Sequence, residues 1–367
     1  MVEKNMIHAL ITHLYGEEGH RYIYHKMFRE AVYQLKIPYV GSTNVECPIE
    51  DLPNDWKRTL HWKEKKRGQL FVRTWDFAKI FGKKAQQPRC FFLESYTIID
   101  LVALVFSFSF FKKQDTFLFF FRSDLPGHGC SSWKIKIYTV LFQLMQKQLK
   151  KRLLFCTDTD RIARYYQELL HQNVHLLPVP HTEGLTTQPL SDPLQLWWVG
   201  SPRKEKGEEI IRLIVRKRSR VPLALALSEE LSLEGEIVLH YLPKVLTRKQ
   251  YEEQMNLSAV ILMPYDPNIY YSRTSGIFIE AISAGKVVVT RKGSWIASEL
   301  EKHDLSELLL DWSKDDLWEK IYELAHDSHI SKKIAAMQRH YREYHSLKGY
   351  TKALKAILSE LPESLKT

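Results

Sequence analysis

Cysteine is scarce in this sequence, and its residues form no recognisable framework. Cys47, Cys90, Cys130 and Cys156 lie far apart, with no C-x-x-C pair and no zinc-like spacing. A disulfide scaffold and a zinc module are therefore not expected. We expect no metal site, and a cytoplasmic location where thiols stay reduced. The start of the chain holds only a short apolar run between charges and no small-residue cleavage site, so a secretory signal is not expected.

Long apolar runs are also lacking. The longest, Tyr96–Phe111, spans 16 residues and is interrupted by Asp100. A membrane-spanning helix needs about 20 apolar residues. Asp100 has no evident partner in the sequence, and an unpaired charge inside a membrane is unfavourable. The run therefore predicts a buried helix rather than a membrane span.

Positive charge is abundant but confined to one half of the chain. Residues 1–190 contain 27 Lys and Arg against 18 Asp and Glu, a difference of +9, whereas residues 191–367 contain 26 against 25. Two basic runs, Lys57–Arg89 and Lys134–Arg152, account for most of the excess. Such runs suit phosphate-bearing partners or are simply solvated surface. An anionic membrane surface is one expected partner, with peripheral attachment at the inner face of the membrane.

Short apolar segments alternate with amphipathic ones along the chain, which is typical of parallel sheets covered by helices on both sides. We therefore predict an α/β protein. A cluster of proline and glycine over 178–193 indicates a linker. It separates a domain over 1–190 from a second over 191–345, followed by a helical tail over 346–367 that we expect to pack back on the first domain. The predicted strands are Ile7–Thr12, Leu35–Val40, Phe117–Phe121, Leu153–Cys156, Val174–Leu177, Leu196–Val199, Leu223–Leu227, Ile237–His240, Ala259–Met263 and Val287–Thr290.

The segment 259–290 carries the strongest local signal: an apolar strand, a loop, a helix from about Ser275 and a further strand. In open α/β sheets, ligands bind at the carboxyl ends of strands, where a helix N-terminus presents free amides. Ser275, Gly276 and Ile277 would present such amides to a phosphate. Glu280, one turn further, would face the same crevice and hold the hydroxyls of a sugar ring.

A second predicted strand ends at Gly200 and leads into a basic loop. This loop carries Arg203 and Lys206, and Gly207 then admits a helix. Long cations at a strand end can reach a diphosphate from the side opposite the amides. Basic loops are common, so this signal gains its weight from the amides beside it.

These residues resemble a known family. Gly200, Lys206-Gly207 and the run from Ser275 to Val289 are similar to the C-terminal domain of the retaining family 4 glycosyltransferases, and Leu177-Pro178-Val179-Pro180 resembles that family's interdomain segment. The resemblance implies the GT-B fold, with two Rossmann-like parallel-sheet domains facing a cleft. It also implies a nucleotide-diphosphate sugar as donor and retention of the anomeric configuration.

The resemblance further implies roles for individual residues. Lys206, with Arg203 beside it, would bind the donor diphosphate, and the amides of Ser275–Ile277 would hold the distal phosphate. Glu280 would bind the ribose hydroxyls, and the backbone of Leu242 would meet the base.

One position departs from the family pattern. The family has a second glutamate eight residues before the one that Glu280 matches, and this chain has Ser272 there. That glutamate contacts the donor sugar, so Ser272 leaves the identity of the sugar open. Arg273 is the candidate replacement contact.

In the first domain, the resemblance implies an acceptor site. Gly19 and His20 follow the first predicted strand and would lie at the cleft. His128, after the predicted strand Phe117–Phe121, resembles the family's cleft histidine in placement and is, with Glu280, the candidate catalytic residue.

We therefore predict a hexosyl-type glycosyltransferase that moves a sugar from a nucleotide-diphosphate donor to a glycan, a lipid-linked glycan or another acceptor. Fixed amides and cations would stabilise the leaving diphosphate without a metal ion, and no cofactor is expected. Two other classes stay open. A catalytically inactive GT-B-like binding protein is motivated by Ser272, and a nucleic-acid-binding protein by the pI of about 9.2. No helix-turn-helix, RRM or zinc signature supports the latter, so no nucleic-acid partner is expected.

Overall fold

The computed structural model describes residues 6–14, 20–62, 68–84, 87–121, 125, 128, 131–180, 190–231 and 233–361, with only the backbone of His20 and Arg21. The chain forms two compact units. Unit 1 comprises Met1–Pro180 together with Leu347–Thr367, and unit 2 comprises His181–Ser346.

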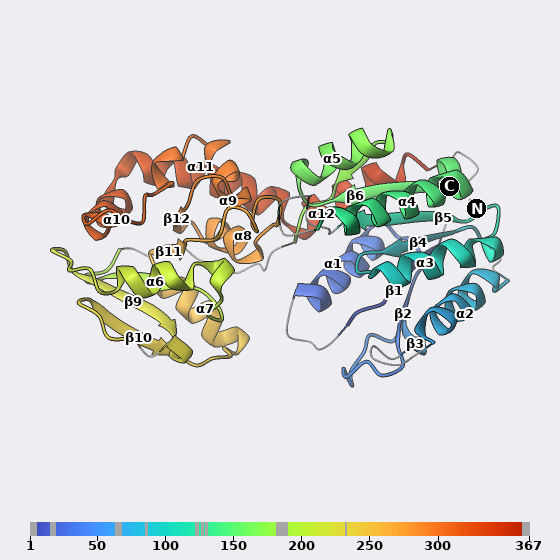
Figure 1. The fold of residues 1–367 in the computed structure, drawn as a ribbon, viewed down its shortest axis with the longest axis horizontal. Helices are drawn as coiled ribbons and strands as arrows, with labels where there is room; N and C mark the ends of the chain where they lie inside the picture. Colours follow the sequence, from blue (N-terminus) through green and yellow to red (C-terminus); the bar gives the residue numbers. More distant parts are fainter. Residues whose placement is uncertain are drawn as a thin grey trace. The chain divides into compact units, whose positions relative to one another are not determined.

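Unit 1 is built on a parallel sheet of seven strands in the order β3-β2-β1-β4-β5-β6-β7 (Figure 1). Its strands are β1 (Met6–Ile11), β2 (Tyr39–Asn44), β3 (Trp56–Leu60), β4 (Arg89–Leu93), β5 (Thr116–Phe121), β6 (Leu153–Thr157) and β7 (Val174–Leu176). Its helices are α1 (His20–Gln34), α2 (Gln69–Gly82), α3 (Ile98–Ser107), α4 (Ser132–Leu149), α5 (Asp160–Leu170) and α12 (Leu347–Leu358).

The strand order decides which helices share a face of this sheet. Because crossovers between parallel strands are right-handed, the helices α2 to α5 cover one face and α1 covers the other. Helix α12 packs against α1, although it comes last in the chain. It adds Tyr350, Leu354 and Ile357 to the core, where the ring of Phe28 stacks on that of Phe92 with centroids 3.8 Å apart.

Unit 2 is built on a parallel sheet of five strands in the order β10-β9-β8-β11-β12. Its strands are β8 (Leu194–Trp198), β9 (Leu223–Ser228), β10 (Val238–Leu242), β11 (Val260–Met263) and β12 (Val287–Thr290). Its helices are α6 (Glu208–Ile214), α7 (Arg248–Leu257), α8 (Gly276–Ser283), α9 (Trp295–Glu301), α10 (Leu317–His326) and α11 (Ser328–Tyr344). The same crossover rule places α6 on one face and α7 and α8 on the other.

Most predicted strands are confirmed to within two residues, but one is displaced and two were missed. The prediction over 35–40 is wrong, because α1 continues to Gln34 and the chain turns at Lys36, whose φ is 57°, before β2 begins at Tyr39. Strands β3 and β4, which lie at the two ends of the long basic run, were missed.

The run Tyr96–Phe111 forms the ten-residue helix α3 and a 3-10 turn, Phe108–Phe110. The expectation that Asp100 lacks a partner is wrong. Asp100 is fully buried, lies 2.8 Å from Nε2 of His13 and pairs with Arg73. Among the described residues, none of the helices has the length and apolar character that crossing a membrane would require.

The basic run Lys57–Arg89 is not one continuous surface. Arg73 and Arg89 are each only 3% exposed, and they pair with Asp100 and Asp115 respectively. Their charges are neutralised in the interior, so the basic surface of the described part of this run depends on Arg58 and the exposed lysines.

Candidate functional site

The carboxyl ends of β8 and β11 bring the two predicted motifs together. These strands are neighbours in the sheet of unit 2, with Leu196 paired to Val260 and Trp198 to Leu262. The basic loop that follows β8 therefore lies beside the loop that leads from β11 into α8. An open end of a parallel sheet is where α/β proteins bind ligands.

Lys206 of the basic loop and Ile277 of α8 both lie close to Gly200. Gly200 has a φ of 92°, and a Cβ placed on it would lie 2.6 Å from Nζ of Lys206 and 4.0 Å from Cδ1 of Ile277. Only glycine leaves room for the lysine there. The side chain of Lys206 thus reaches back over the strand end toward the start of α8.

The loop that carries Lys206 is held rigidly. Nε1 of Trp198 donates a hydrogen bond to the Lys206 carbonyl at 3.2 Å, and the amide of Asp266 donates to the Glu205 carbonyl at 2.9 Å. Gly207, with a φ of 83°, packs so tightly that a Cβ would lie 2.4 Å from the carbonyl oxygen of Pro264. These contacts fix the backbone of the loop from which the Lys206 side chain extends.

The side chain of Lys206 is largely buried and has no described counter-ion. The residue is 6% exposed, and no described residue forms a hydrogen bond or ion pair with its Nζ. Burial, reinforced by the nearby charge of Arg203, lowers the pKa of Lys206 to about 8, although Glu205 opposes the shift. A buried cation that lacks an anion is the arrangement expected of an anion-binding residue.

The start of α8 presents free amides at the same strand end. Ser275 is the N-cap residue, and its Oγ accepts a hydrogen bond from the amide of Phe278 at 3.3 Å. The amides of Gly276 and Ile277 find no acceptor in the part of the chain that the structure describes. Free amides and the helix dipole together favour an anion here.

Glu280 is held in place by α7, which sequence reasoning missed. Its carboxylate accepts a hydrogen bond from the Tyr251 hydroxyl at 2.6 Å and lies 3.4 Å from Nη1 of Arg248. The ring of Tyr251 packs on Trp197 of β8, with centroids 5.4 Å apart. The capping box formed by Thr247 and Gln250 marks the start of α7 in the sequence, but nothing there points to Glu280.

The other residues predicted to bind the donor differ in their exposure to solvent. Arg203 is exposed and lies 3.5 Å from Glu205, whereas Ser272 is fully buried and its hydroxyl has no described partner. Arg273, next to Ser272, is exposed. Leu242 ends the edge strand β10, from which a short loop leads into α7, the helix that carries Arg248 and Tyr251.

The acceptor residues predicted in unit 1 are only partly described. Gly19 and the side chain of His20 lie outside the described residues, and His20 begins α1. His128 is half-buried after β5, and its amide donates to the Leu125 carbonyl at 3.0 Å.

Unit 1 carries a buried charged cluster at the carboxyl ends of β1 and β4 that the sequence did not indicate. Asp100 receives the contacts of His13 and Arg73 and also forms a capping box with Thr97, whose amide donates to its carboxylate at 2.6 Å. The guanidinium of Arg73 lies 4.9 Å from the ring centre of Trp62. These contacts fasten α3 to α2 and to the end of β1.

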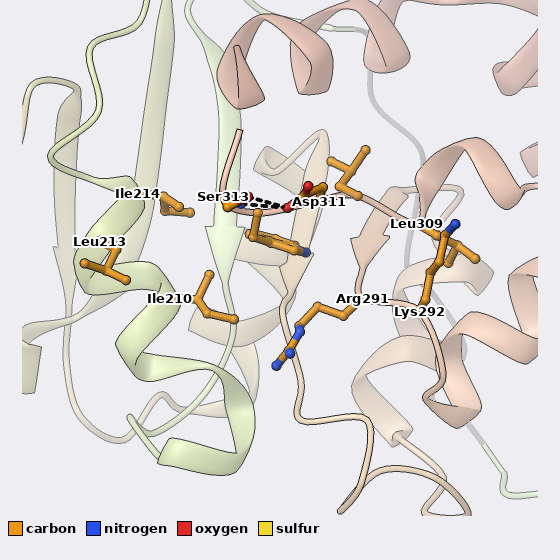
Figure 2. Close-up of a pocket in the computed structure, with 10 residues that line it drawn as sticks. Ile210, Leu213, Ile214, Arg291, Lys292, Leu309, Asp311 and Ser313 are labelled. Atoms are coloured by element: carbon orange, nitrogen blue, oxygen red, sulfur yellow. Dashed lines mark hydrogen bonds between the residues drawn. The ribbon is translucent and has the colours of Figure 1, made fainter. Parts of the chain in front are cut away.

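A cavity of about 670 Å³ lies elsewhere in unit 2. Figure 2 shows Ile210, Leu213 and Ile214 of α6 on one side of it and Arg291, from the segment after β12, extending toward them. None of the predicted site residues lines this cavity. We place the candidate site at the strand ends, where fixed amides and a buried cation converge.

Comparisons with known proteins agree on the fold. No protein-family model and no curated protein matches the sequence. Among solved structures, a glycosyltransferase from Rickettsia africae ESF-5 has a TM-score of 0.69 at 12% identity, covering 98% of this chain and 99% of its own. A structure described as trehalose-6-phosphate from E. coli bound with UDP-2-fluoro glucose has a TM-score of 0.64 at 10% identity, covering 96% and 98%. The α,α-trehalose 6-phosphate synthase of Burkholderia multivorans has a TM-score of 0.59 at 11% identity, covering 97% and 98%.

These likenesses confirm the predicted fold class. The chain has the GT-B fold, with two α/β units built on parallel sheets.

Proposed function

We propose that this protein is a glycosyltransferase that transfers a hexosyl group from a nucleotide-diphosphate sugar to a hydroxyl-bearing acceptor. The observation that carries the proposal is the largely buried side chain of Lys206, which lies without a described counter-ion at the same end of the sheet as the free amides of α8. The E. coli structure is described as bound with UDP-2-fluoro glucose, which is a molecule of the donor class.

In the proposed reaction, the bond between the anomeric carbon and the diphosphate oxygen breaks, and its electron pair leaves with the diphosphate. An acceptor oxygen forms the new bond to the anomeric carbon and loses its proton. Negative charge grows on the diphosphate as the bond breaks. Cations and N–H groups held in fixed positions beside the diphosphate therefore stabilise the transition state more than they stabilise the bound nucleotide sugar. Lys206, Arg203 and the amides of Ser275–Ile277 would supply those donors without a metal ion or cofactor.

Glu280 would bind the ribose hydroxyls, because Tyr251 and Arg248 orient its carboxylate, whose oxygens accept hydrogen bonds. Leu242 would meet the base, and Arg273 and Ser272 would border the sugar. His128 and Glu280 are the proposed catalytic side chains, with His128, His20 and Gly19 on the acceptor side. Retention of configuration follows from the family resemblance and belongs to the proposal.

Screening a panel of UDP-, GDP- and ADP-sugars for nucleotide release tests the function directly. Release with at least one donor, increased by a sugar or lipid-linked acceptor and unchanged by EDTA, is expected. Binding of nucleoside diphosphates without any release across the panel would favour the inactive GT-B-like binding protein. Salt-sensitive binding of DNA or RNA without nucleotide binding would favour the nucleic-acid class.

Replacement of Glu280 by alanine is expected to weaken the binding of the parent nucleotide by about 10- to 150-fold. A lost hydrogen bond to a charged group costs about 1.5–3 kcal/mol. Isothermal titration calorimetry measures the change, and Glu253→Ala, on an exposed part of α7, is the matched control. An unchanged dissociation constant for Glu280→Ala would remove the residue from the site.

The excess charge of unit 1 supports a further part of the proposal, which is peripheral attachment of a cytoplasmic enzyme to an anionic membrane. Unit 2, which would hold the donor, contributes none of the net charge of +10, because residues 181–346 contain 22 Lys and Arg against 24 Asp and Glu. Donor binding therefore does not explain the basic residues of unit 1, whereas a glycan or lipid-linked acceptor at a membrane surface does.

A further inference from the structure

The exposed apolar side chains of this chain concentrate on three helices of unit 1. Among the described residues, seventeen large hydrophobic side chains are exposed, and nine lie on α2, α4 and α3 with its 3-10 turn. We call these nine the aromatic face: Leu70, Phe71, Trp75, Ile99, Phe106, Phe110, Trp133, Val140 and Leu144. Every exposed Phe and Trp of the described residues belongs to it. Single exposed apolar residues are ordinary, but a concentration of this kind marks an interaction surface.

The spacing of these residues places them on the outer side of each helix. In α4, Val140 and Leu144 follow Trp133 by seven and eleven residues, and in α3 Phe106 follows Ile99 by seven, with Phe110 in the 3-10 turn beyond. In α2, Trp75 follows Phe71 by four. Intervals of four, seven and eleven keep side chains on one side of a helix.

The three helices are neighbours on one face of the sheet. Helix α3 packs against both α2 and α4, and Figure 1 shows the three helices side by side in front of the strands. The outward stripes of α2, α3 and α4 therefore form one surface rather than three separate patches.

The charge of this surface has one sign. Helices α2 and α3 each contain a single acidic residue, Asp76 and Asp100, and these are 2% and 0% exposed, while α4 contains none. Lysines stand among the rings: Nζ of Lys79 lies 5.3 Å from the ring centre of Trp75, and Nζ of Lys134 lies 5.8 Å from that of Trp133. Lys136 and Lys147 add two exposed charges on α4.

We propose that the aromatic face docks on an anionic lipid bilayer, with its Phe and Trp rings at the headgroup level and its lysines against lipid phosphates. Tryptophan favours the membrane–water interface, and an apolar face combined with lysines is typical of interfacial helices. A surface with no exposed carboxylate on its three helices complements a layer of phosphates. The inference rests on the peripheral attachment proposed above, and it assigns that attachment to insertion of rings as well as to charge.

Vesicle binding of the full chain tests this assignment. Wild type is mixed with neutral vesicles of phosphatidylcholine or with anionic vesicles that also contain phosphatidylglycerol. Each mixture is sedimented at low and at high salt. The variant Phe71→Ser/Trp75→Ser/Phe106→Ser is compared with the matched control Leu213→Ser/Val245→Ser/Leu257→Ser, whose three positions are similarly exposed in unit 2. We expect wild type and control to bind the anionic vesicles alike, and the aromatic-face variant to bind at least tenfold more weakly.

The outcomes separate this inference from the proposed function. Equal binding by all three proteins, fully reversed by salt, would overturn ring insertion and leave electrostatic attachment. No binding of wild type would overturn both forms of attachment and leave the surface to a protein partner. The affinity for a nucleoside diphosphate, measured on the same samples, is expected to be the same in wild type and in the aromatic-face variant. Absence of nucleoside diphosphate binding in wild type would refute the transferase proposal alone.

Fluorescence gives a second readout that does not depend on affinity. Lipids brominated on the acyl chain quench tryptophan rings that enter the bilayer, and Trp75→Phe/Trp133→Phe keeps the apolar surface while removing its two exposed indoles. We expect quenching of bound wild type and loss of that quenching in the double variant, which still binds. Identical quenching in both proteins would contradict insertion of the aromatic face.

Discussion

Replacement of Lys206 by alanine is expected to lower turnover by about a hundredfold to a thousandfold, the range seen when one fixed donor to a developing negative charge is removed. Nothing in the described part of the chain neutralises this ammonium, so the fold gains little from its charge. The free energy of unfolding is therefore expected to stay close to that of wild type, although turnover falls. The affinity for a nucleoside diphosphate is expected to fall much more than the affinity for the bare nucleoside.

The control for this experiment lies on the same loop. The side chain of Lys204 is 87% exposed and approaches Glu209 at 3.5 Å, so Lys204→Ala is expected to leave both affinities near wild type. Equal weakening of nucleoside and nucleoside diphosphate by Lys206→Ala would show that the lysine does not contact phosphate.

The lowered pKa of Lys206 adds a pH dependence. The charged form binds the diphosphate, and in the free protein that form is lost as the pH rises through about 8. Diphosphate affinity of wild type is therefore expected to decrease above pH 8, by up to about tenfold per pH unit. Calorimetry from pH 6.5 to 9.5 measures this, and Lys206→Ala is expected to lack the decrease.

Replacement of Asp100 by asparagine is expected to destabilise the protein by about 3–5 kcal/mol, because it leaves the buried charge of Arg73 without its partner. Chemical unfolding followed by circular dichroism measures the loss. Asp315→Asn is the control, since that carboxylate is fully exposed at the surface, and a change within about 0.5 kcal/mol is expected there. A similarly small change for Asp100→Asn would show that the cluster does not hold α3 in place.

The same pair predicts how stability depends on pH. Burial alone would raise the pKa of Asp100, but the hydrogen bond from His13 and the charges of His13 and Arg73 hold it below its ordinary value of 3.8. As the pH falls below about 4, the unfolded chain takes up this proton before the folded one does, and the stabilisation is lost. The stability difference between wild type and Asp100→Asn is therefore expected to shrink below pH 4.

Much of the fold could be predicted because buried parallel strands are apolar throughout. Val287–Thr290 was predicted with its observed bounds, and Ser275 caps the helix expected there. Strand β3 was not predicted because it is an edge strand in which only Trp56 and Leu60 are buried. Strand β4 begins with Arg89, whose charge is neutralised by Asp115, a residue 26 positions away that no local pattern can indicate.

Individual residues of the candidate site could be predicted from the sequence, but the contacts between them could not. Spacing and the family resemblance selected Lys206 and Glu280, but the sequence does not show that Gly200, against which Nζ of Lys206 lies, is also close to Ile277 in α8. The hydrogen bond from Tyr251 to Glu280 likewise joins α7 and α8, which come together only when the chain has folded.

Helix α12 has a consequence for how the protein is made. The chain leaves unit 1 at Pro180 and returns to it only at Leu347, after all of unit 2 has been synthesised. Until then, the core around Phe28 lacks Tyr350, Leu354 and Ile357. Ribosome-bound chains that end before residue 347 are expected to expose a protease-sensitive unit 1, even though its seven strands have already been translated. Pulse proteolysis of stalled chains of increasing length is expected to show protection of unit 1 appearing after that of unit 2, the reverse of their order in the sequence.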